Sequence, residues 1–191
     1  MADGRPGEFD FYVLALTWSP GWCATVDDPP PAECRRAGRG FVVHGLWPQY
    51  ERGYPRDCAS PMSGRVDRSL VAALADIMPD GGLVGHQWRR HGMCSGLSAA
   101  DYFALVRRAL AVVSPPALGA DPDRRMTPAA IEAAFAARNL GLSPRGMSVQ
   151  CRAGALTEVR ICLTGDLEFR ACAEVDRDAC GAGTVRVPPP D

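Results

Sequence analysis

Eight cysteines constrain this chain of 191 residues more than any other feature of its sequence. They are spread over the whole chain, at positions 23, 34, 58, 94, 151, 162, 172 and 180. No two have the C-x-x-C spacing, so the usual signatures of zinc ribbons and thioredoxin-like proteins are missing. An even number of dispersed cysteines favours four disulfides and an oxidising compartment; the alternative is eight buried thiols in a cytosolic enzyme. The spacing does not choose among the possible pairings.

The composition is that of a globular protein, with 47% hydrophobic and 23% charged residues, which excludes a disordered or collagen-like chain. The length predicts a single domain over residues 1–191, with a hydrophobic core that is large enough to form without metals or disulfides. The net charge of −1 gives no overall basic excess, so a nucleic-acid substrate would need a local basic cluster. Apolar stretches such as Phe11–Leu16 are far shorter than the ~20 residues that cross a bilayer, so we expect no membrane partner.

The N-terminal residues Met1–Glu8 are polar and do not resemble a signal peptide. We therefore expect the mature or trimmed form of a periplasmic or secreted protein. Residues 1–8 and 188–191 are expected to be flexible tails.

Hydrophobic periodicity predicts strands near both ends of the chain and helices between them. Strands are expected at 9–18, 41–44, 158–163 and 167–171, and helices at 69–78, 98–113 and 128–138. Gly45 and Pro48 are expected to end the second strand, and the last two strands are expected to be buried on one face only. The fold class is therefore α+β, a single domain with a mostly antiparallel sheet flanked by helices.

All three histidines lie between positions 44 and 91, and two of them share the segment 86–91. If this segment is helical, His86, Gln87, Arg90 and His91 occupy one face and Trp88 points away. A guanidinium can bind two phosphate oxygens at once, and imidazoles can donate or transfer protons. The pattern therefore predicts a histidine-based site for a phosphate-containing substrate.

A zinc site made by the three histidines is the main competing interpretation, followed by a purely structural cluster. Two observations disfavour zinc: His86 and His91 are five residues apart, whereas helical ligand pairs are four apart, and their segment contains no Asp or Glu. We therefore expect neither a metal nor another cofactor.

Imidazole titrates near pH ~6.5, so a neutral and a protonated histidine on opposite sides of a phosphodiester can act as base and acid. RNA supplies its own nucleophile, the 2′-hydroxyl, and needs no serine, cysteine or metal for this purpose. DNA lacks that group. The arrangement is therefore consistent with cleavage of RNA.

Two long motifs resemble the active-site segments of the ribonuclease T2 family. They are Phe41-Val-Val-His44-Gly-Leu-Trp47-Pro48 and His86-Gln-Trp-Arg-Arg-His91-Gly-Met-Cys94. The segments 9–18, 139–145 and 158–162 are also similar to the family, so the resemblance covers nearly the whole chain. It implies a secreted or periplasmic endoribonuclease that needs no metal and cleaves single-stranded RNA through a 2′,3′-cyclic phosphate, then to a 3′-phosphate, with little base preference.

The resemblance also implies roles for individual residues. His44 would be the general acid that protonates the 5′-oxygen, and His91 the base that takes the 2′-hydroxyl proton. His86 would bind the phosphate, and Arg90, where the family usually has lysine, would stabilise the transition state. For the base of the substrate, it implies contacts with Trp47, Gln49 and Tyr50.

Four disulfides follow from the same resemblance: Cys23–Cys34, Cys58–Cys94, Cys151–Cys180 and Cys162–Cys172. The second would connect the loop after the first motif to the end of the second. We expect a monomer with RNA as its only partner.

Two residues depart from the family pattern. Arg90 keeps the positive charge, and the chain contains no lysine at all, so this exchange follows the composition. Gln87 replaces the family's glutamate, and an amide can neither carry charge nor accept a proton. Three hypotheses result: an active ribonuclease with His44, Gln87 and His91 at its catalytic centre, a relative that binds RNA but has lost efficient turnover, and a metal-dependent hydrolase.

Overall fold

A strand with every residue buried, β1, lies inside the sheet and pairs on both sides. The computed structural model describes residues 4–26, 34, 40–119, 121–181 and 183–190, and these form one six-stranded sheet of order β2–β1–β5–β6–β3, with β4 also paired with β5. The strands are β1 (Phe11–Trp18), β2 (Phe41–Gln49), β3 (Arg125–Met126), β4 (Met147–Arg152), β5 (Ala155–Leu163) and β6 (Val185–Arg186). All pairings are antiparallel except a short one between β5 and β6, as expected for the α+β class.

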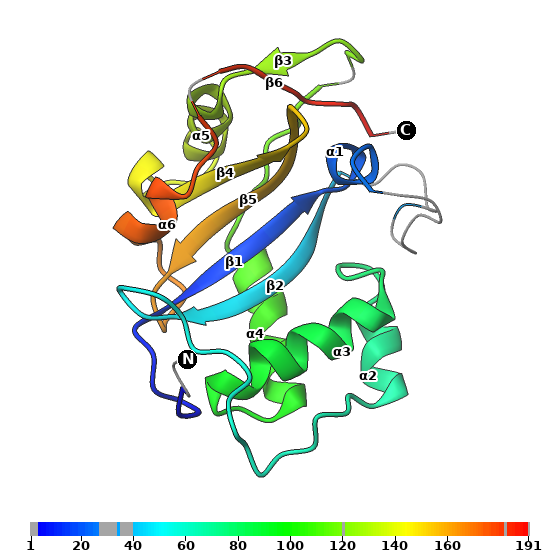
Figure 1. Ribbon diagram of the computed structural model, residues 1–191, viewed down its shortest axis with the longest axis vertical. Coiled ribbons are helices and arrows are strands. Elements are labelled where there is room, and N and C mark those ends of the chain that lie inside the picture. The colour runs from blue at the N-terminus through cyan, green and yellow to red at the C-terminus, as the bar shows by residue number, and fades with distance from the viewer. Residues whose placement is uncertain (1–3, 27–33, 35–39, 120, 182, 191) are drawn as a thin grey trace.

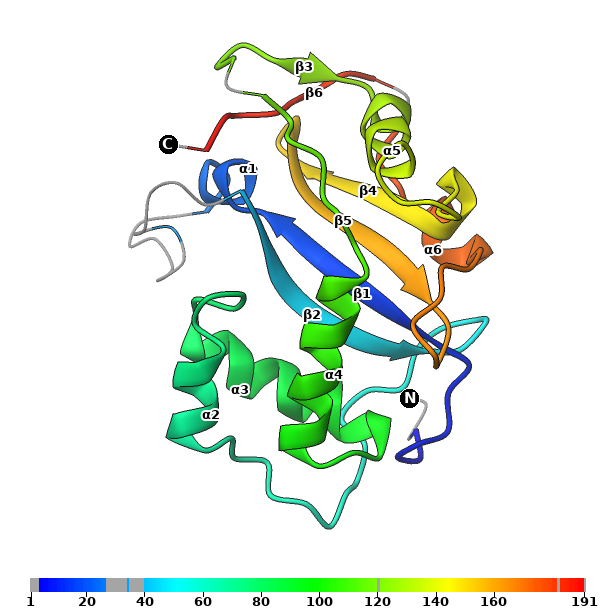
Figure 2. The same cartoon turned by 180° about the vertical axis from the view of Figure 1, so that it is seen from behind.

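The helices gather in two groups around this sheet (Figures 1 and 2). They are α1 (Ser19–Cys23), α2 (Arg68–Ala73), α3 (Gly81–Arg90), α4 (Ala99–Ala111), α5 (Pro128–Ala136) and α6 (Ala173–Arg177), with 3₁₀ turns at Gly92–Ser95 and Pro144–Gly146. Helix α4 crosses one face of the sheet, with α2 and α3 beside β2, whereas α5 and α6 lie by β4. None of the described helices combines the length and the apolar character needed to cross a membrane.

Helix α3 carries much of the functional segment and begins at a side-chain cap. Asp80 accepts hydrogen bonds from the backbone N–H groups of Gly82 and Leu83, which otherwise lack partners inside the helix. Val84 and Trp88 are fully buried in the core, and the Trp88 indole N–H donates to a backbone carbonyl at Ser63. These contacts set the rotation of the helix, with Trp88 pointing away from the opposite face, as its sequence position predicts.

An irregularity in β2 determines where His44 points. Ala15 of β1 pairs with Gly45, but Leu16 pairs with Val43, so His44 is an extra residue without a partner on β1. Such a bulge changes the alternation of side chains along a strand. It allows Val43 and Leu46 both to enter the core, while His44 leaves from the other face.

The prediction that Gly45 and Pro48 end this strand is wrong, because β2 continues to Gln49. Gly45 keeps its backbone paired with Ala15. Pro48 is tolerated because β2 is an edge strand of the sheet, where a missing N–H breaks no ladder. Tyr102 of α4 fixes the strand from behind by donating its hydroxyl proton to the carbonyl of Leu46, at 2.7 Å.

Two further strand predictions are wrong for one reason: β5 is an inner strand. Its edges pair with β1 and β4, so the predicted strand at 167–171 finds no free edge and makes only an isolated bridge between Leu163 and Phe169. The prediction that β5 is buried on one face only is also wrong. Cys162, on the second face of β5, is fully buried and packs with Phe11 and Val13. The sequence pattern predicts no strand over 147–152, where the structure forms β4.

The structure contains the four disulfides that the family resemblance implies. Cys58–Cys94 joins the loop after β2 to the turn after α3, with its Cα atoms 5.1 Å apart, so it connects the two segments that carry the histidines. Flexibility at the chain ends stays a prediction. Within the described residues, Gly7 donates its N–H to the carbonyl of Cys94, and the carbonyl of Pro188 accepts from the indole of Trp18.

Replacing Gly45 by alanine is expected to destabilise the protein by about 1–3 kcal/mol, because the added Cβ would collide with the side chains of Gln87 and Trp47. Urea denaturation measures this loss. Gly165→Ala is the matched control, since nothing lies within 4 Å of a Cβ added there. Equal stability of the two variants would contradict the close approach at Gly45.

Candidate active site

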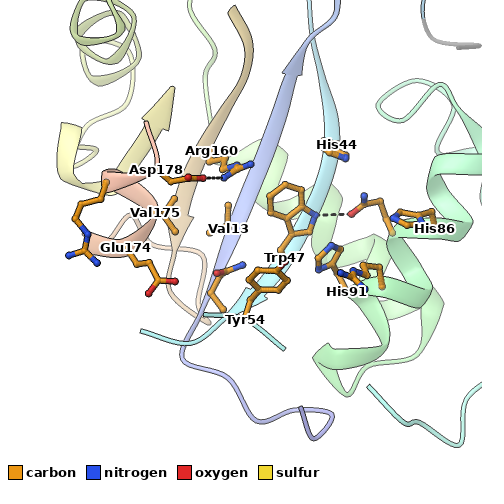
Figure 3. A pocket seen from close by; sticks show the side chains of 14 residues that line it. Val13, His44, Trp47, Tyr54, His86, His91, Arg160, Glu174, Val175 and Asp178 are labelled. Atoms are coloured by element: carbon orange, nitrogen blue, oxygen red, sulfur yellow. Dashed lines mark hydrogen bonds and ion pairs between the residues drawn. The ribbon is translucent and has the colours of Figure 1, made fainter. Parts of the chain in front are cut away.

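A cavity of about 700 Å³ opens over the face of the sheet from which His44 emerges (Figure 3). β1 and β2 form its floor, the end of α3 lies on one side, and α6 lies on the other. The residues that line it are Val13, His44, Trp47, Gln49, Tyr54, His86, Gln87, Arg90, His91, Arg160, Glu174, Val175, Arg177 and Asp178. His44, about forty residues before the other two histidines in sequence, therefore shares one cavity with them.

Trp47 lies at the centre of this cavity and contacts both histidines of the proposed acid–base pair. Its ring stacks on His91 with centroids 5.3 Å apart, and it meets His44 edge to face at 5.2 Å. The guanidinium of Arg160 lies 5.4 Å from the ring centroid. The indole N–H donates to Oε1 of Gln87 at 2.7 Å, so the amide of that buried residue orients the tryptophan.

His91 follows the last residue of α3 and is held in an electropositive, largely buried place. Its Nδ1 is buried and finds no hydrogen-bond partner in the described part of the chain, which leaves Nε2 to meet a substrate. Burial, followed by the charges of Arg90, His44 and His86, lowers the pKa of His91 to about 3. His91 is therefore neutral at ordinary pH and can accept a proton.

His44 has a different environment, which the sequence around it does not indicate. Its Nδ1 lies 2.6 Å from Oε2 of Glu158 on β5. Burial alone would raise the pKa of Glu158, but the hydrogen bonds and charges of His44 and Arg160 outweigh it and lower that pKa. Arg160 donates from Nε to Oε1 of Glu158 at 2.8 Å and from Nη1 to Asp178 at 2.6 Å.

Arg90 is held at the edge of the cavity by an ion pair with Asp57. The backbone N–H of Asp57 also donates to the carbonyl of Arg90, at 3.0 Å. Asp57 has a φ of 51°, in the left-handed region that Asp and Asn tolerate better than most residues. The next residue, Cys58, is bonded to Cys94, so the disulfide fixes the loop that presents this carboxylate.

A second cavity of about 380 Å³ adjoins the first and shares His44 and Arg160 with it. Its other lining residues are Thr17, Trp22, Asp80, Leu83, Gln150, Cys151, Thr157 and Glu158. His44 therefore lies where two cavities meet, and a chain-like substrate could extend in both directions from it.

Seven of the eight predicted site residues line the first cavity. Tyr50 does not; its backbone N–H donates to the carbonyl of Gly53, and the side chain of Tyr54 lines the cavity instead, 6.1 Å from the ring of His91. The sequence does not identify Glu158 and Arg160 as site residues. Their segment resembles the family, but only the pairing of β1 with both β2 and β5 brings it to His44.

The described residues contain no group of three His, Cys, Asp or Glu side chains arranged to hold a metal ion. The arrangement of the three histidines therefore does not match a three-histidine zinc site, the main competing interpretation of the sequence. Their neighbours are Trp47, Arg90 and Glu158, which suit proton transfer beside an anion.

The family model of the Ribonuclease T2 family matches residues 9–172, and the chain belongs to this family. A ribonuclease from Aeromonas hydrophila is 45% identical over 107 residues, which are 55% of this chain and 46% of that protein. Ribonuclease DdI from Dictyostelium discoideum is 24% identical over 205 residues, which cover 96% of this chain and 86% of that protein. The chain spans about half the length of the first of these relatives.

Solved structures agree on the fold. An RNase-related protein from Calystegia sepium superimposes with a TM-score of 0.74 at 22% identity, covering 95% of this chain and 98% of that one. RNase NT, solved in complex with 5′-AMP, gives a TM-score of 0.73 at 22% identity and covers 96% and 100%. At these identities the likeness concerns the fold alone.

Gln87→Glu is expected to raise the pKa of His91, because a carboxylate beside Trp47 would offset the positive charges around the imidazole. An NMR titration of the His91 ring proton measures this directly. Gln87→Leu, which removes the hydrogen bond without adding charge, is the control. An unchanged or lowered pKa in Gln87→Glu would refute the prediction.

Proposed function

We propose that this protein is a metal-independent endoribonuclease that cleaves single-stranded RNA. The observation that carries the proposal is the pair His44 and His91, which both contact the Trp47 ring in one cavity beside Arg90 and His86. Two imidazoles and a guanidinium are the groups needed to move protons around a phosphodiester and to stabilise its developing negative charge.

In the first step, His91 takes the proton of the ribose 2′-hydroxyl through Nε2. The 2′-oxygen attacks the phosphorus, and the bond from phosphorus to the 5′-oxygen breaks as His44 donates a proton to that oxygen. The products are a 2′,3′-cyclic phosphate and a free 5′-hydroxyl. The low pKa of His91 supports its role as the base, because the imidazole is neutral before the step.

In the second step, water opens the cyclic phosphate and the two histidines exchange roles. His44, now neutral, takes a proton from the attacking water, and His91 returns its proton to the 2′-oxygen, leaving a 3′-phosphate. Arg90 and His86 bind the phosphate oxygens. For Arg90 this requires that the substrate share or displace the carboxylate of Asp57.

The two cavities that meet at His44 support cleavage within a chain, since each can accept a nucleotide on one side of the scissile bond. Trp47 and Tyr54 offer aromatic surfaces on which any base can stack, which favours low base specificity. Gln49 supplies an amide on the floor of the first cavity. A folded RNA duplex would not present such unstacked bases, so the proposed substrate is single-stranded.

Four disulfides support a periplasmic or extracellular location, where such bonds persist. We propose that the protein acts there as a monomer, because one chain supplies every group that the proposed reaction uses.

Digestion of single-stranded RNA, with and without EDTA, tests the proposed function. We expect cleavage that EDTA does not abolish and a 2′,3′-cyclic phosphate among the early products. His91→Ala is expected to lower the rate by about 10²–10⁴, the usual contribution of a general base. Loss of activity with EDTA would instead favour the metal-dependent hydrolase.

A relative that binds RNA without efficient turnover is the second candidate, and the observation that favours it is the neutral amide of Gln87. That amide accepts the Trp47 indole N–H, so it supplies no charge to the phosphate. Binding of RNA at nanomolar to micromolar concentration by the wild-type protein, without any cleavage, would favour this candidate.

RNA cleavage is expected to persist into acid solution and to fall only near pH 3, where His91 becomes protonated. The sign follows from the role of the base, which must be neutral to accept the 2′-hydroxyl proton. A pH profile of kcat/KM on a short oligonucleotide measures this limb. The Gln87→Glu variant should move it to higher pH, and a limb near pH 6 in the wild type would contradict the effect of burial.

A further inference from the structure

A largely buried carboxylate, that of Glu158, contacts His44 and lines the second cavity but not the first. The side chain of Glu158 is only 10% exposed, and its two oxygens have separate partners: Oε2 lies 2.6 Å from Nδ1 of His44, and Oε1 accepts from Nε of Arg160. Among the residues that the structure describes, Glu158 is the carboxylate that forms an ion pair with a histidine of the site.

The chemistry of this contact fixes which nitrogen of His44 carries a proton. Hydrogen bonds and charges from His44 and Arg160 outweigh the burial of Glu158 and keep it ionised, and an ionised carboxylate can only accept hydrogen bonds. Nδ1 of His44 is therefore the donor, and Nε2 is the nitrogen left to face the substrate. A nearby negative charge also stabilises the imidazolium form, the form that a general acid requires before it reacts.

Arg160 makes this arrangement stiff. It is bound at one end to Glu158 and at the other to Asp178, while its guanidinium lies over the ring of Trp47. A charge held by two partners and an aromatic face has few alternative conformations. The carboxylate of Glu158 is therefore held in place rather than free to turn toward solvent.

We propose that Glu158 is a positioning residue for the reaction, which holds His44 with its Nδ1 proton bound and its Nε2 proton ready for the leaving 5′-oxygen, and that Arg160 holds Glu158 in that position. The inference rests on the proposed ribonuclease function and on His44 as its general acid. Glu158 also places a carboxylate from β5 in the site, whereas position 87 on α3 is occupied by the neutral amide of glutamine.

Other charged side chains line the two cavities that share His44. They are Arg90 of α3, Arg160 of β5, Glu174, Arg177 and Asp178 at α6, and Asp80, whose carboxylate is bonded to the N-terminus of α3. Among the described carboxylates, Glu158 is the one within hydrogen-bond distance of the His44 imidazole.

The test compares two substrates that differ in their leaving group. A dinucleoside phosphate such as uridylyl-adenosine releases a 5′-alkoxide, which needs the proton of His44. Uridine 3′-(4-nitrophenyl phosphate) releases a phenoxide, a much weaker base that leaves without a proton. A group that acts through the general acid affects the first substrate and spares the second.

Glu158→Gln is expected to lower kcat on the dinucleotide about 10- to 100-fold, the usual worth of a charge-assisted hydrogen bond, with little change on the nitrophenyl ester. His44→Ala should show the same contrast between substrates, and adding Glu158→Gln to it should cost no further activity. Glu168→Gln, which changes an exposed carboxylate just after β5, is the matched control.

Equal losses on both substrates would overturn the proposal, because they would indicate damage to the fold rather than to the acid. No loss on the dinucleotide would overturn it as well. A ¹⁵N NMR spectrum gives an independent readout, since wild-type His44 should carry its proton on Nδ1 and Glu158→Gln should weaken that preference. Wild-type protein that cleaves neither substrate would refute the proposed function itself, and the positioning role with it.

Discussion

The pairing of β1 with β2 on one side and β5 on the other is the constraint on which the site depends. Ala15 of β1 pairs with Gly45 on β2 and with Arg160 on β5, so segments more than a hundred residues apart lie two strands from each other. The register of this fully buried strand is fixed, because a shift of one residue would exchange the side chains of its two faces and disrupt the packing on both. The distance between His44 and Glu158 is fixed by this register.

The bulge at His44 adds the second constraint. Regular alternation from Val43 would send Leu46 out of the core, and the extra residue corrects this so that both are buried. His44 and Trp47 consequently reach the same cavity, although they are three residues apart. The absence of a Cβ at Gly45 then leaves room for the indole of Trp47 to meet the amide of Gln87.

His44 and His91 contact the same tryptophan, yet their electrostatic environments are opposite. His91 is buried among positive charges, which lower its pKa, whereas His44 is bonded to an ionised carboxylate. Pairs of titratable groups whose environments differ in this way are typical of sites that carry out acid and base steps together. The Cys58–Cys94 disulfide connects the loop of Asp57 to the end of α3, so it bears on the geometry of Arg90 as well as on stability.

The sequence by itself determined the local parts of this protein: the motif around His44, the helical face of His86, Gln87 and Arg90, and the α+β class. These follow from short-range periodicity and from residue chemistry, and the structure forms them largely as expected. It did not determine that β2 continues past Gly45, that β5 is an inner strand, or that Glu158 reaches His44. Only the tertiary structure decided these, because they depend on which strand pairs with which, and in what register, across large distances in sequence.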